Sequence, residues 1–170
     1  MTHLHGEQVE LRSIADDDRA PLRAIRETPE VDRWWGPLEE DFPEEDYPDG
    51  TRLVVLLGGE VIGMVQYEEE PDAVYRHADV DIFLDPAHHG RGLGTDAMRT
   101  IADYLITERG HHRLTLTTSP DNAGAIRCYE KAGFRRVGVT RASELDVRTG
   151  KWVDELLMEL VDLRTGHTSA

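Results

Sequence analysis

The sequence predicts an α+β fold in which helices pack against one mixed β-sheet. Short stretches that alternate apolar and polar residues, which are typical of strands, are interspersed with longer stretches of helical periodicity. No internal repeat and no linker-like segment divides the 170 residues. A chain of this length can bury one substantial hydrophobic core. We therefore expect a single domain over residues 1–170, with a disordered tail formed by the last few residues.

The first elements are a strand and two helical segments. Residues 9–14 alternate like a strand, and residues 16–27 are interpreted as a helix because three aspartates open it. Pro21 fits the first turn of this helix, where a missing N–H breaks no hydrogen bond. Residues 31–35 add a short helical piece. The prolines, glycines and acidic residues of 36–50 then predict a surface loop.

The middle of the chain carries a strong hairpin signal. Residues 52–57 and 60–67 are strand-like, and Gly58–Gly59 between them suits a two-residue turn. The acidic stretch 68–72 interrupts the pattern. A further strand is predicted over residues 77–85, and Pro86 ends it.

The remaining elements alternate between helix and strand. A helix is predicted over about residues 92–109 and a strand over 113–118. Residues 119–133 predict a second helix, which Asp121 or Asn122 opens and Gly133 ends, since glycine readily takes the left-handed conformation of a C-cap. Residues 134–140 and 151–160 are expected to form a closing antiparallel pair, joined by a loop that ends at Thr149–Gly150.

Composition limits the classes of partner. The chain has 19 Lys and Arg against 34 Asp and Glu, a formal net charge of −15. A nucleic-acid partner is excluded because phosphate backbones require a basic face. The negative charge favours a cationic partner, although it also serves solubility alone. Cys128 is the single cysteine, which excludes an internal disulfide, and the longest apolar run, residues 53–57, is too short to span a bilayer. We expect a cytoplasmic protein without a membrane partner, either a monomer or a homodimer.

Three glycines, at positions 90, 92 and 94, lie at the start of the helix predicted over 92–109. The first turn of a helix presents unpaired N–H groups and the positive end of the helix dipole, and glycine lets an anion approach that backbone closely. The pattern is not a P-loop, because no lysine follows Gly94, and it is not a G-x-G-x-x-G fingerprint, because the third glycine comes one residue early. The glycines predict a phosphate cradle of another kind, or a plain strand–helix turn.

A second motif decides between these interpretations. It comprises Asn122, Ala125, Tyr129, Gly133 and Phe134 within residues 119–134. Together with the stretch 89–94 (HGRGLG), it resembles the acetyl-coenzyme A site of the GCN5-related N-acetyltransferases (GNAT), over roughly residues 52–140. The resemblance implies a GNAT fold: a mixed, mostly antiparallel sheet flanked by helices, with a splayed strand pair that holds acetyl-coenzyme A.

Within that superfamily the chain is most similar to the aminoglycoside 6′-N-acetyltransferases. Three stretches carry this similarity: 33–36 (RWWG), 59–66 (GEVIGMVQ) and 80–84 (VDIFL). The resemblance implies main-chain contacts that bind the pyrophosphate at the glycine loop and pair with the pantetheine arm like an extra strand. The implied cofactor-binding residues are Ile82, Phe83, Leu84, His89, Gly90, Arg91, Gly92, Leu93, Gly94, Thr95, Asn122, Ala125 and Tyr129. The implied substrate-binding residues are Trp34, Trp35, Gln66, Asp79 and Asp81.

Acetyl transfer to an amine needs a base and an acid. Alternation places Asp79, Asp81 and Phe83 on one face of their strand, and the resemblance implies that Asp81 is the base that takes a proton from the amine. Tyr129 is the implied acid that protonates the departing sulfur. Cys128 beside it is rejected as an acetyl-carrying nucleophile, because no histidine lies at a suitable spacing and direct transfer needs none.

Other features allow more than one interpretation. Trp34 and Trp35 either brace a sugar ring or pack the helix onto the sheet, and the acidic stretches 39–46 and 68–72 either form the rim of a polycation pocket or are merely solvated. The pairs His88–His89 and His111–His112 are expected on the surface, and we expect no metal.

The predicted function is acetyl transfer to a small polycationic amine, the 6′-amine of an aminoglycoside, in a ternary complex with acetyl-coenzyme A. A protein, peptide or siderophore amine is the alternative acceptor within the same fold, and a non-catalytic acetyl-coenzyme A sensor is the alternative of another class.

Overall fold

The structure is a computed structural model that describes residues 2–43 and 50–164. Its strands are β1 (His3–His5), β2 (Glu10–Ser13), β3 (Gly50–Leu57), β4 (Glu60–Glu69), β5 (Ala78–Leu84), β6 (Arg113–Thr118), β7 (Arg135–Asp146) and β8 (Lys151–Val161). Its helices are α1 (Arg19–Arg26), α2 (Pro29–Trp35), α3 (Leu93–Thr107) and α4 (Ala123–Ala132), with 3-10 turns at Asp16–Asp18 and Pro86–His88. The predicted tail and part of the predicted loop 36–50 lie outside the described residues.

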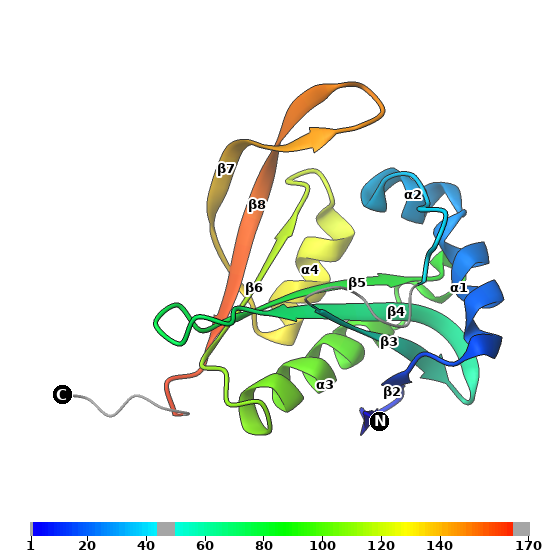
Figure 1. Ribbon diagram of the computed structural model, residues 1–170, viewed down its shortest axis with the longest axis horizontal. Coiled ribbons are helices and arrows are strands. Elements are labelled where there is room, and N and C mark those ends of the chain that lie inside the picture. The colour runs from blue at the N-terminus through cyan, green and yellow to red at the C-terminus, as the bar shows by residue number, and fades with distance from the viewer. Residues whose placement is uncertain (1, 44–49, 165–170) are drawn as a thin grey trace.

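The strands form one mixed sheet in the order β1-β2-β3-β4-β5-β6-β8-β7 (Figure 1). Every described neighbouring pair is antiparallel except β5 and β6, which run parallel. The α+β prediction is therefore confirmed. Parallel neighbours require a crossover connection, and α3 supplies it between β5 and β6.

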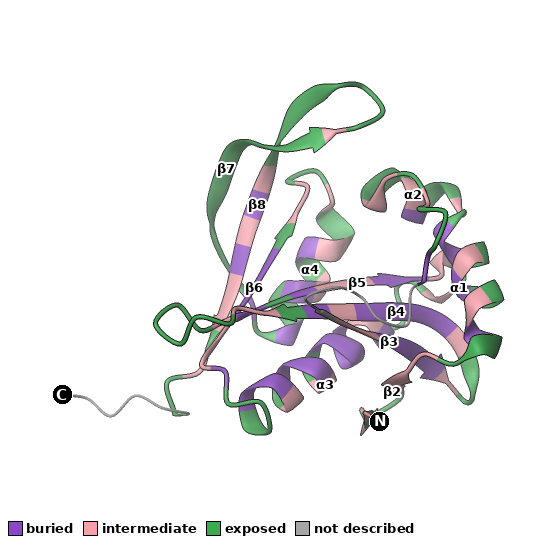
Figure 2. Ribbon diagram, in the orientation of Figure 1, coloured by how far each residue is buried: buried purple, intermediate pink, exposed green. Residues whose placement is uncertain are grey.

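Two hydrophobic clusters hold the sheet, one on each face. Figure 2 shows that α3 and much of β4 are buried, whereas most of β7 is exposed. The larger cluster joins α3 and α4 to residues such as Leu53, Val80 and Leu84, and the smaller joins α1 and α2 to Val54 and Phe83. Alternating residues of β3 and β5 thus supply opposite clusters, as a period of two requires. The face that carries Phe83 also carries Asp81, so the proposed base lies on the side of α1 and α2.

The parallel pair β5–β6 separates after a short contact. Only Ala78 and Asp79 of β5 pair with β6, opposite Leu114 and Thr115, although β5 continues to Leu84 and β6 continues to Thr118. This is the splayed strand pair that the resemblance implied. Beyond Asp79, the side of β5 that faced β6 has no neighbouring strand, whereas its other side still pairs with β4.

The prediction missed one strand and placed the end of another too early. Strand β1 was not predicted, because three residues are too few to show alternation, and it pairs with β2 at the edge of the sheet. Residues 141–146 were expected in a loop but belong to β7, which pairs with β8 as far as Asp146. A bulge interrupts the regular pattern here. Thr140 lies opposite Glu155 and Glu144 lies opposite Val153, so four residues of β7 span the same length as two residues of β8.

The turn between β1 and β2 is attached to α3 by one buried carboxylate. Asp96 Oδ1 accepts the N–H of Glu7 at 2.9 Å, and Oδ2 accepts the N–H groups of Gln8 and Val9 at 2.7 and 2.9 Å. The turn approaches so closely that a Cβ on Gly6 would lie 2.7 Å from Asp96 Oδ2. Asp96 therefore joins the N-terminal hairpin to the helix that begins at the glycine loop.

Candidate active site

A cavity of about 970 Å³ opens where β5 and β6 separate. Its wall combines α2, β4, β5, the glycine loop, the end of β6, α4 and the β7–β8 hairpin. It gathers these residues that the sequence singled out: Trp34, Trp35, Gln66, Asp81, Ile82, Phe83, Leu84, His89, Gly90, Gly92, Leu93, Gly94, Thr95, Asn122, Ala125 and Tyr129.

Two of the singled-out residues do not line this cavity. Arg91 is exposed on the glycine loop. Asp79 lines a smaller neighbouring cavity that Gln66 and Asp81 also border, and the Thr115 hydroxyl donates a hydrogen bond to its carboxylate. The side chain of Asp79 is thus held at the point where β5 and β6 still pair.

The glycine loop has the shape that an anion cradle requires. Gly90 and Gly92 have positive φ angles of 73° and 78°, and Gly92 is the N-cap of α3. No heavy atom lies within 4 Å of a Cβ built at either glycine, so the space next to this backbone is open. His89 fixes the loop to the end of β5, because its Nε2 donates to the Leu84 carbonyl at 3.0 Å. The helix N-terminus and the bare backbone together suit a pyrophosphate.

Helix α4 borders the same end of the cavity. The Asn122 side chain caps it by accepting the Ala125 N–H at 3.2 Å, and Gly133 ends it in the left-handed conformation, as the sequence predicts. Arg127 and Lys131 of α4 also line the cavity. These cations lie on the helix that packs closely against the glycine loop, since a Cβ on Gly94 would lie 3.1 Å from Cys128 Sγ.

Asp81 occupies the middle of the cavity wall, opposite Gln66 in the β4–β5 register. Burial raises the pKa of Asp81 to about 7, and the Glu144 carboxylate also raises it, whereas the Ile82 N–H and Arg26 act in the opposite direction. The Ile82 N–H donates to Asp81 Oδ1 at 2.9 Å, which fixes the carboxylate beside the gap. A carboxylate with a pKa near neutrality can hold a proton and release it at physiological pH.

Tyr129 supplies a neutral phenol to the same cavity. Its side chain is buried and lies edge-on to Phe134, with ring centroids 6.4 Å apart. Burial raises the pKa of Tyr129 well above its usual value, and the charge of Asp81 and the neighbouring Cys128 raise it further. The phenol therefore keeps its proton and can donate it.

Cys128 lines the cavity as a thiol. Burial raises its pKa, and the Thr95 hydroxyl, 3.6 Å from the sulfur, only partly opposes this shift. A thiol is a far weaker nucleophile than a thiolate. The environment thus agrees with the rejection of Cys128 as an acetyl carrier.

The two tryptophans of α2 play different structural roles. Trp35 packs edge-on against Phe83, with centroids 4.9 Å apart, and Arg26 lies 5.4 Å from its ring centre. Trp34 is more exposed and carries Arg33 on its ring at 4.4 Å. Trp35 is thus both a packing residue and part of the cavity wall, and Trp34 borders the opening.

The cavity wall contains four further carboxylates, of which only Glu39, in the acidic stretch 39–46, was considered from the sequence as part of a pocket rim. They are Glu30, Glu39, Glu144 and Glu155, and they come from α2, the segment after it, β7 and β8. Burial raises the pKa of Glu144, and the nearby carboxylates of Glu155 and Asp146 raise it further. Glu144 was not predicted as a site residue, because it lies in the part of β7 that was expected to be a loop.

The tip of the β7–β8 hairpin and α2 lie at the same end of the molecule (Figure 1), and the Arg148 side chain connects them. Arg148 Nη2 lies 2.5 Å from Asp32 Oδ1 and donates to the Asp32 carbonyl at 3.0 Å. This contact connects α2, which carries Glu30, to the β7–β8 hairpin, which carries Glu144 and Glu155. The acidic stretch 39–46 contributes Glu39 to the cavity, and its residues 44–46 lie outside the described residues.

The structure decides between the two interpretations of the stretch 68–72 and corrects the expectation for His111. The stretch 68–72 does not reach the large cavity, and Glu69 binds Arg109 at 2.7 Å and His111 Nε2 at 2.6 Å instead. His111 was expected on the surface but is buried, because Glu69 of β4 compensates its polar nitrogen. In the segments that the structure describes, no helix is long and apolar enough to cross a bilayer.

Comparisons with known proteins agree with this geometry. Residues 11–134 match the model of the Acetyltransferase (GNAT) family. An aminoglycoside N(6′)-acetyltransferase type 1 from Klebsiella pneumoniae is 31% identical over 155 residues, covering 78% of this chain and 77% of that protein. The spermidine N(1)-acetyltransferase of Escherichia coli K12 is 30% identical over 135 residues, covering 74% and 72%.

A solved structure shows the same fold with ligands. The aminoglycoside acetyltransferase AAC(6′)-Ib in complex with coenzyme A and kanamycin superposes with a TM-score of 0.75 at 26% identity, over 95% of this chain and 99% of that one. The relatives thus share the fold and differ in the amine that their names specify. The glycine cradle, the splayed strands and the family match lead to one conclusion: this chain belongs to the GNAT acetyltransferase family and is an N-acetyltransferase that takes its acetyl group from acetyl-coenzyme A.

Proposed function

We propose that the acceptor is a small polycationic amine, namely the 6′-amine of an aminoglycoside, and that transfer is direct within a ternary complex. The observation that carries this proposal is the set of carboxylates around the cavity. The Glu144 carboxylate raises the pKa of Asp81, and the Glu155 carboxylate raises the pKa of Glu144. Glu30 and Glu39 line the same cavity. A cluster of carboxylates is best neutralised by a ligand with several ammonium groups.

The proposed reaction divides the cavity between its two substrates. The glycine loop and the start of α3 would hold the pyrophosphate of acetyl-coenzyme A, with Arg127 and Lys131 on the neighbouring helix. The acidic side would hold the amine. Because the basic and acidic residues come from different elements, each substrate meets complementary charge. We place this reaction in the cytoplasm, where a single free cysteine stays reduced.

Proton transfer in the proposed mechanism uses two residues. Asp81 takes a proton from the ammonium group, which frees the nitrogen lone pair to form the new N–C bond. The C–S bond of the thioester breaks, and the Tyr129 hydroxyl gives its proton to the departing sulfur. The nitrogen, made acidic by the new N–C bond, loses its second proton, which restores the Tyr129 hydroxyl, and Asp81 releases the first proton to solvent. The mechanism supports the proposal because the pKa of Asp81 lies near neutrality, whereas burial keeps Tyr129 protonated.

A thiol-release assay with acetyl-coenzyme A tests the acceptor. We expect turnover with kanamycin, and we expect it to disappear when a hydroxyl replaces the 6′-amine. Spermidine, a lysine-containing peptide and a simple diamine are run in parallel. Turnover with one of these and none with kanamycin would contradict the aminoglycoside proposal while leaving acetyl transfer intact.

Replacing Tyr129 with phenylalanine tests the proposed acid. We expect kcat to fall by about 10²-fold, because the sulfur then leaves without a positioned proton donor. The KM for acetyl-coenzyme A should change little, since the ring and its packing against Phe134 remain. Steady-state kinetics measure both values. The control is Tyr75→Phe, because Tyr75 is exposed and far from the cavity lining. An unchanged kcat in Tyr129→Phe would show that this phenol is not the acid.

A further inference from the structure

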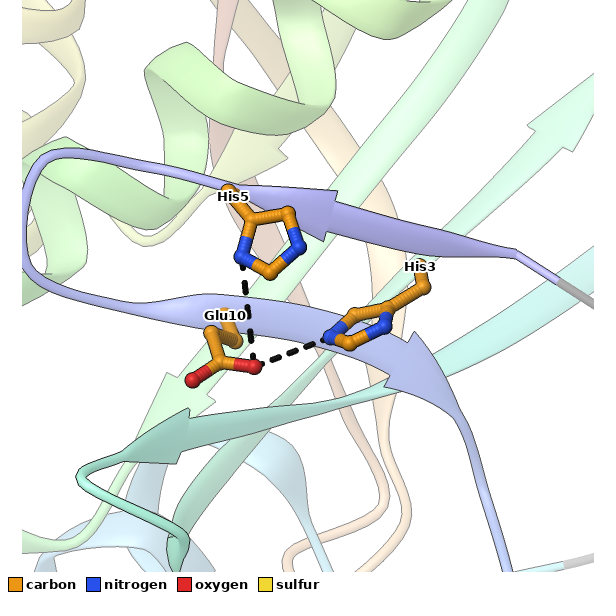
Figure 3. Close-up of side chains that lie close together, drawn as sticks. All are labelled: His3, His5 and Glu10. Carbon is orange, nitrogen blue, oxygen red and sulfur yellow. Dashed lines mark hydrogen bonds and ion pairs between the residues drawn. The ribbon is translucent and has the colours of Figure 1, made fainter.

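A group of three potential metal ligands lies at the edge of the sheet, away from the cavity. His3 and His5 belong to β1, and Glu10 belongs to β2 (Figure 3). His3 and His5 are two residues apart on a strand, so both side chains extend from the same face. Glu10 lies directly opposite His5 in the antiparallel register, which brings its carboxylate to that face as well.

The distances within this group suit one shared ion. Glu10 Oε2 lies 2.9 Å from His3 Nε2 and 3.9 Å from His5 Nδ1, and the two imidazole rings have centroids 4.5 Å apart. One ligand atom from each residue lies within 4.8 Å of the other two. Zinc binds imidazole nitrogen and carboxylate oxygen at about 2.0–2.2 Å, so its ligand atoms lie about 3–4 Å from one another. Small rotations of these exposed side chains bring all three into that range.

We propose that His3, His5 and Glu10 form a binding site for a divalent transition-metal ion, with zinc as the expected occupant. Two imidazoles and one carboxylate favour zinc, copper or nickel over magnesium and calcium, which prefer all-oxygen ligands. Water completes the coordination, because the three side chains are 50%, 67% and 40% exposed. Solvent access and three protein ligands imply micromolar rather than structural-zinc affinity.

The backbone under the site is held in place independently of the ion. Leu4, between the two histidines, packs against the larger hydrophobic cluster on the opposite face of β1. The turn that follows His5 is fixed by the Asp96 carboxylate. Arg12, which faces His3 across the register, is held by Asp18 at 2.6 and 2.9 Å, so its positive charge is already paired. The ligands therefore lie on a prepared scaffold, and the ion would connect β1 to β2.

The site is separate from acetyl transfer, because none of its three residues lines the large cavity. The two histidine pairs considered from the sequence are adjacent residues and point apart. The signal for this site was instead the pair His3 and His5, two residues apart on one strand. It was missed because β1 itself was not predicted.

Calorimetric titration of zinc chloride into the untagged, chelator-treated full chain tests the proposal. We expect one ion per chain with a micromolar Kd, and no heat from magnesium chloride. His3→Ala, His5→Ala and Glu10→Gln should each weaken zinc binding by about tenfold or more. The matched control is His112→Ala, which removes a histidine elsewhere and should bind zinc like the unmodified protein.

A second measurement separates loss of ligands from loss of folding. Zinc should raise the Tm of the unmodified chain and leave that of the His3→Ala/His5→Ala variant unchanged, because a ligand stabilises only the state that binds it. Acetyl-transfer kcat of the double variant should match that of the unmodified chain. The proposal is overturned if the unmodified chain binds no zinc, or if the double variant keeps the same stoichiometry and affinity.

Discussion

Replacement of Asp81 by asparagine is expected to lower kcat/KM for the amine by about 10²- to 10⁴-fold, the usual contribution of a positioned base. Asparagine keeps the size of the side chain, and its oxygen can still accept the Ile82 N–H. It cannot accept a proton from the ammonium group. Steady-state kinetics with saturating acetyl-coenzyme A measure the change, and the exposed Asp103→Asn variant on α3 is the control.

The pH dependence of the same pair of proteins gives an independent check. Because the base must be ionised, kcat/KM of the unmodified enzyme should rise with pH through about 7, the raised pKa of Asp81. In Asp81→Asn, the rise in kcat/KM near pH 7 should vanish. A rise caused by deprotonation of the amine substrate itself should remain. An Asp81→Asn enzyme that keeps the rise near pH 7 would show that another group is the base.

Stability should change in the direction opposite to activity. The pKa of Asp81 is higher in the folded chain than in the unfolded one, so ionising it costs folding free energy as pH rises from about 4 to 7, and the full cost is present above 7. Asparagine does not ionise. The Tm difference between Asp81→Asn and the unmodified chain should therefore grow in favour of the variant from pH 4 to pH 8. A variant that is inactive yet more stable at pH 8 would identify Asp81 as a residue kept for function.

Among the variants considered, Asp96→Ala is expected to lose the most stability, about 3–5 kcal/mol of unfolding free energy. Three backbone N–H groups lose their common acceptor, and each such bond to a charged group contributes about 1.5–3 kcal/mol without full additivity. For a chain of this size the loss corresponds to a Tm decrease of about 10 °C. Thermal unfolding followed by circular dichroism measures it.

Two further variants identify the cause of that loss. Asp96→Asn should be nearly as unstable, because Oδ1 and Oδ2 both accept N–H groups and an amide offers only one acceptor oxygen. Asp103→Ala removes an exposed aspartate from the same helix and should melt like the unmodified chain. If Asp96→Ala melted like Asp103→Ala, the carboxylate would not be what holds the N-terminal hairpin.

Local patterns were sufficient for most of the fold. The apolar run of β3, the alternation at the start of β5, the Gly58–Gly59 turn and the cap of α4, predicted at Asp121 or Asn122, depend on neighbouring residues, and the structure contains each of them, with Asn122 as the cap. The separation of β5 from β6 came from a family resemblance rather than from a pattern. No property of either strand alone says that pairing stops at Asp79.

The missed features depend on residues far apart in the chain. His111 is buried because Glu69, 42 residues earlier, pairs with it, and no local rule foresees that partner. Glu144 lines the cavity because β7 continues beyond Thr140 and pairs there with β8, opposite Val153, and this pairing depends on the partner strand. Glu30, Glu144 and Glu155 were therefore not predicted as wall residues, whereas Asp81 was named because a family resemblance implied its role and the alternation of its strand gave its face.

A sheet that divides in its middle has two interior rims in addition to its outer edges. The outer edge of a sheet can pair with another chain and so promote aggregation. The separated edges of β5 and β6 lie inside the molecule, where the gap between them suits a narrow ligand. In the proposed complex, the main-chain N–H and C=O groups of β5 would pair with the arm of acetyl-coenzyme A, and every residue possesses such groups. The side chains of β5 can therefore change during evolution to suit a new acceptor amine without altering the main-chain groups that would bind acetyl-coenzyme A.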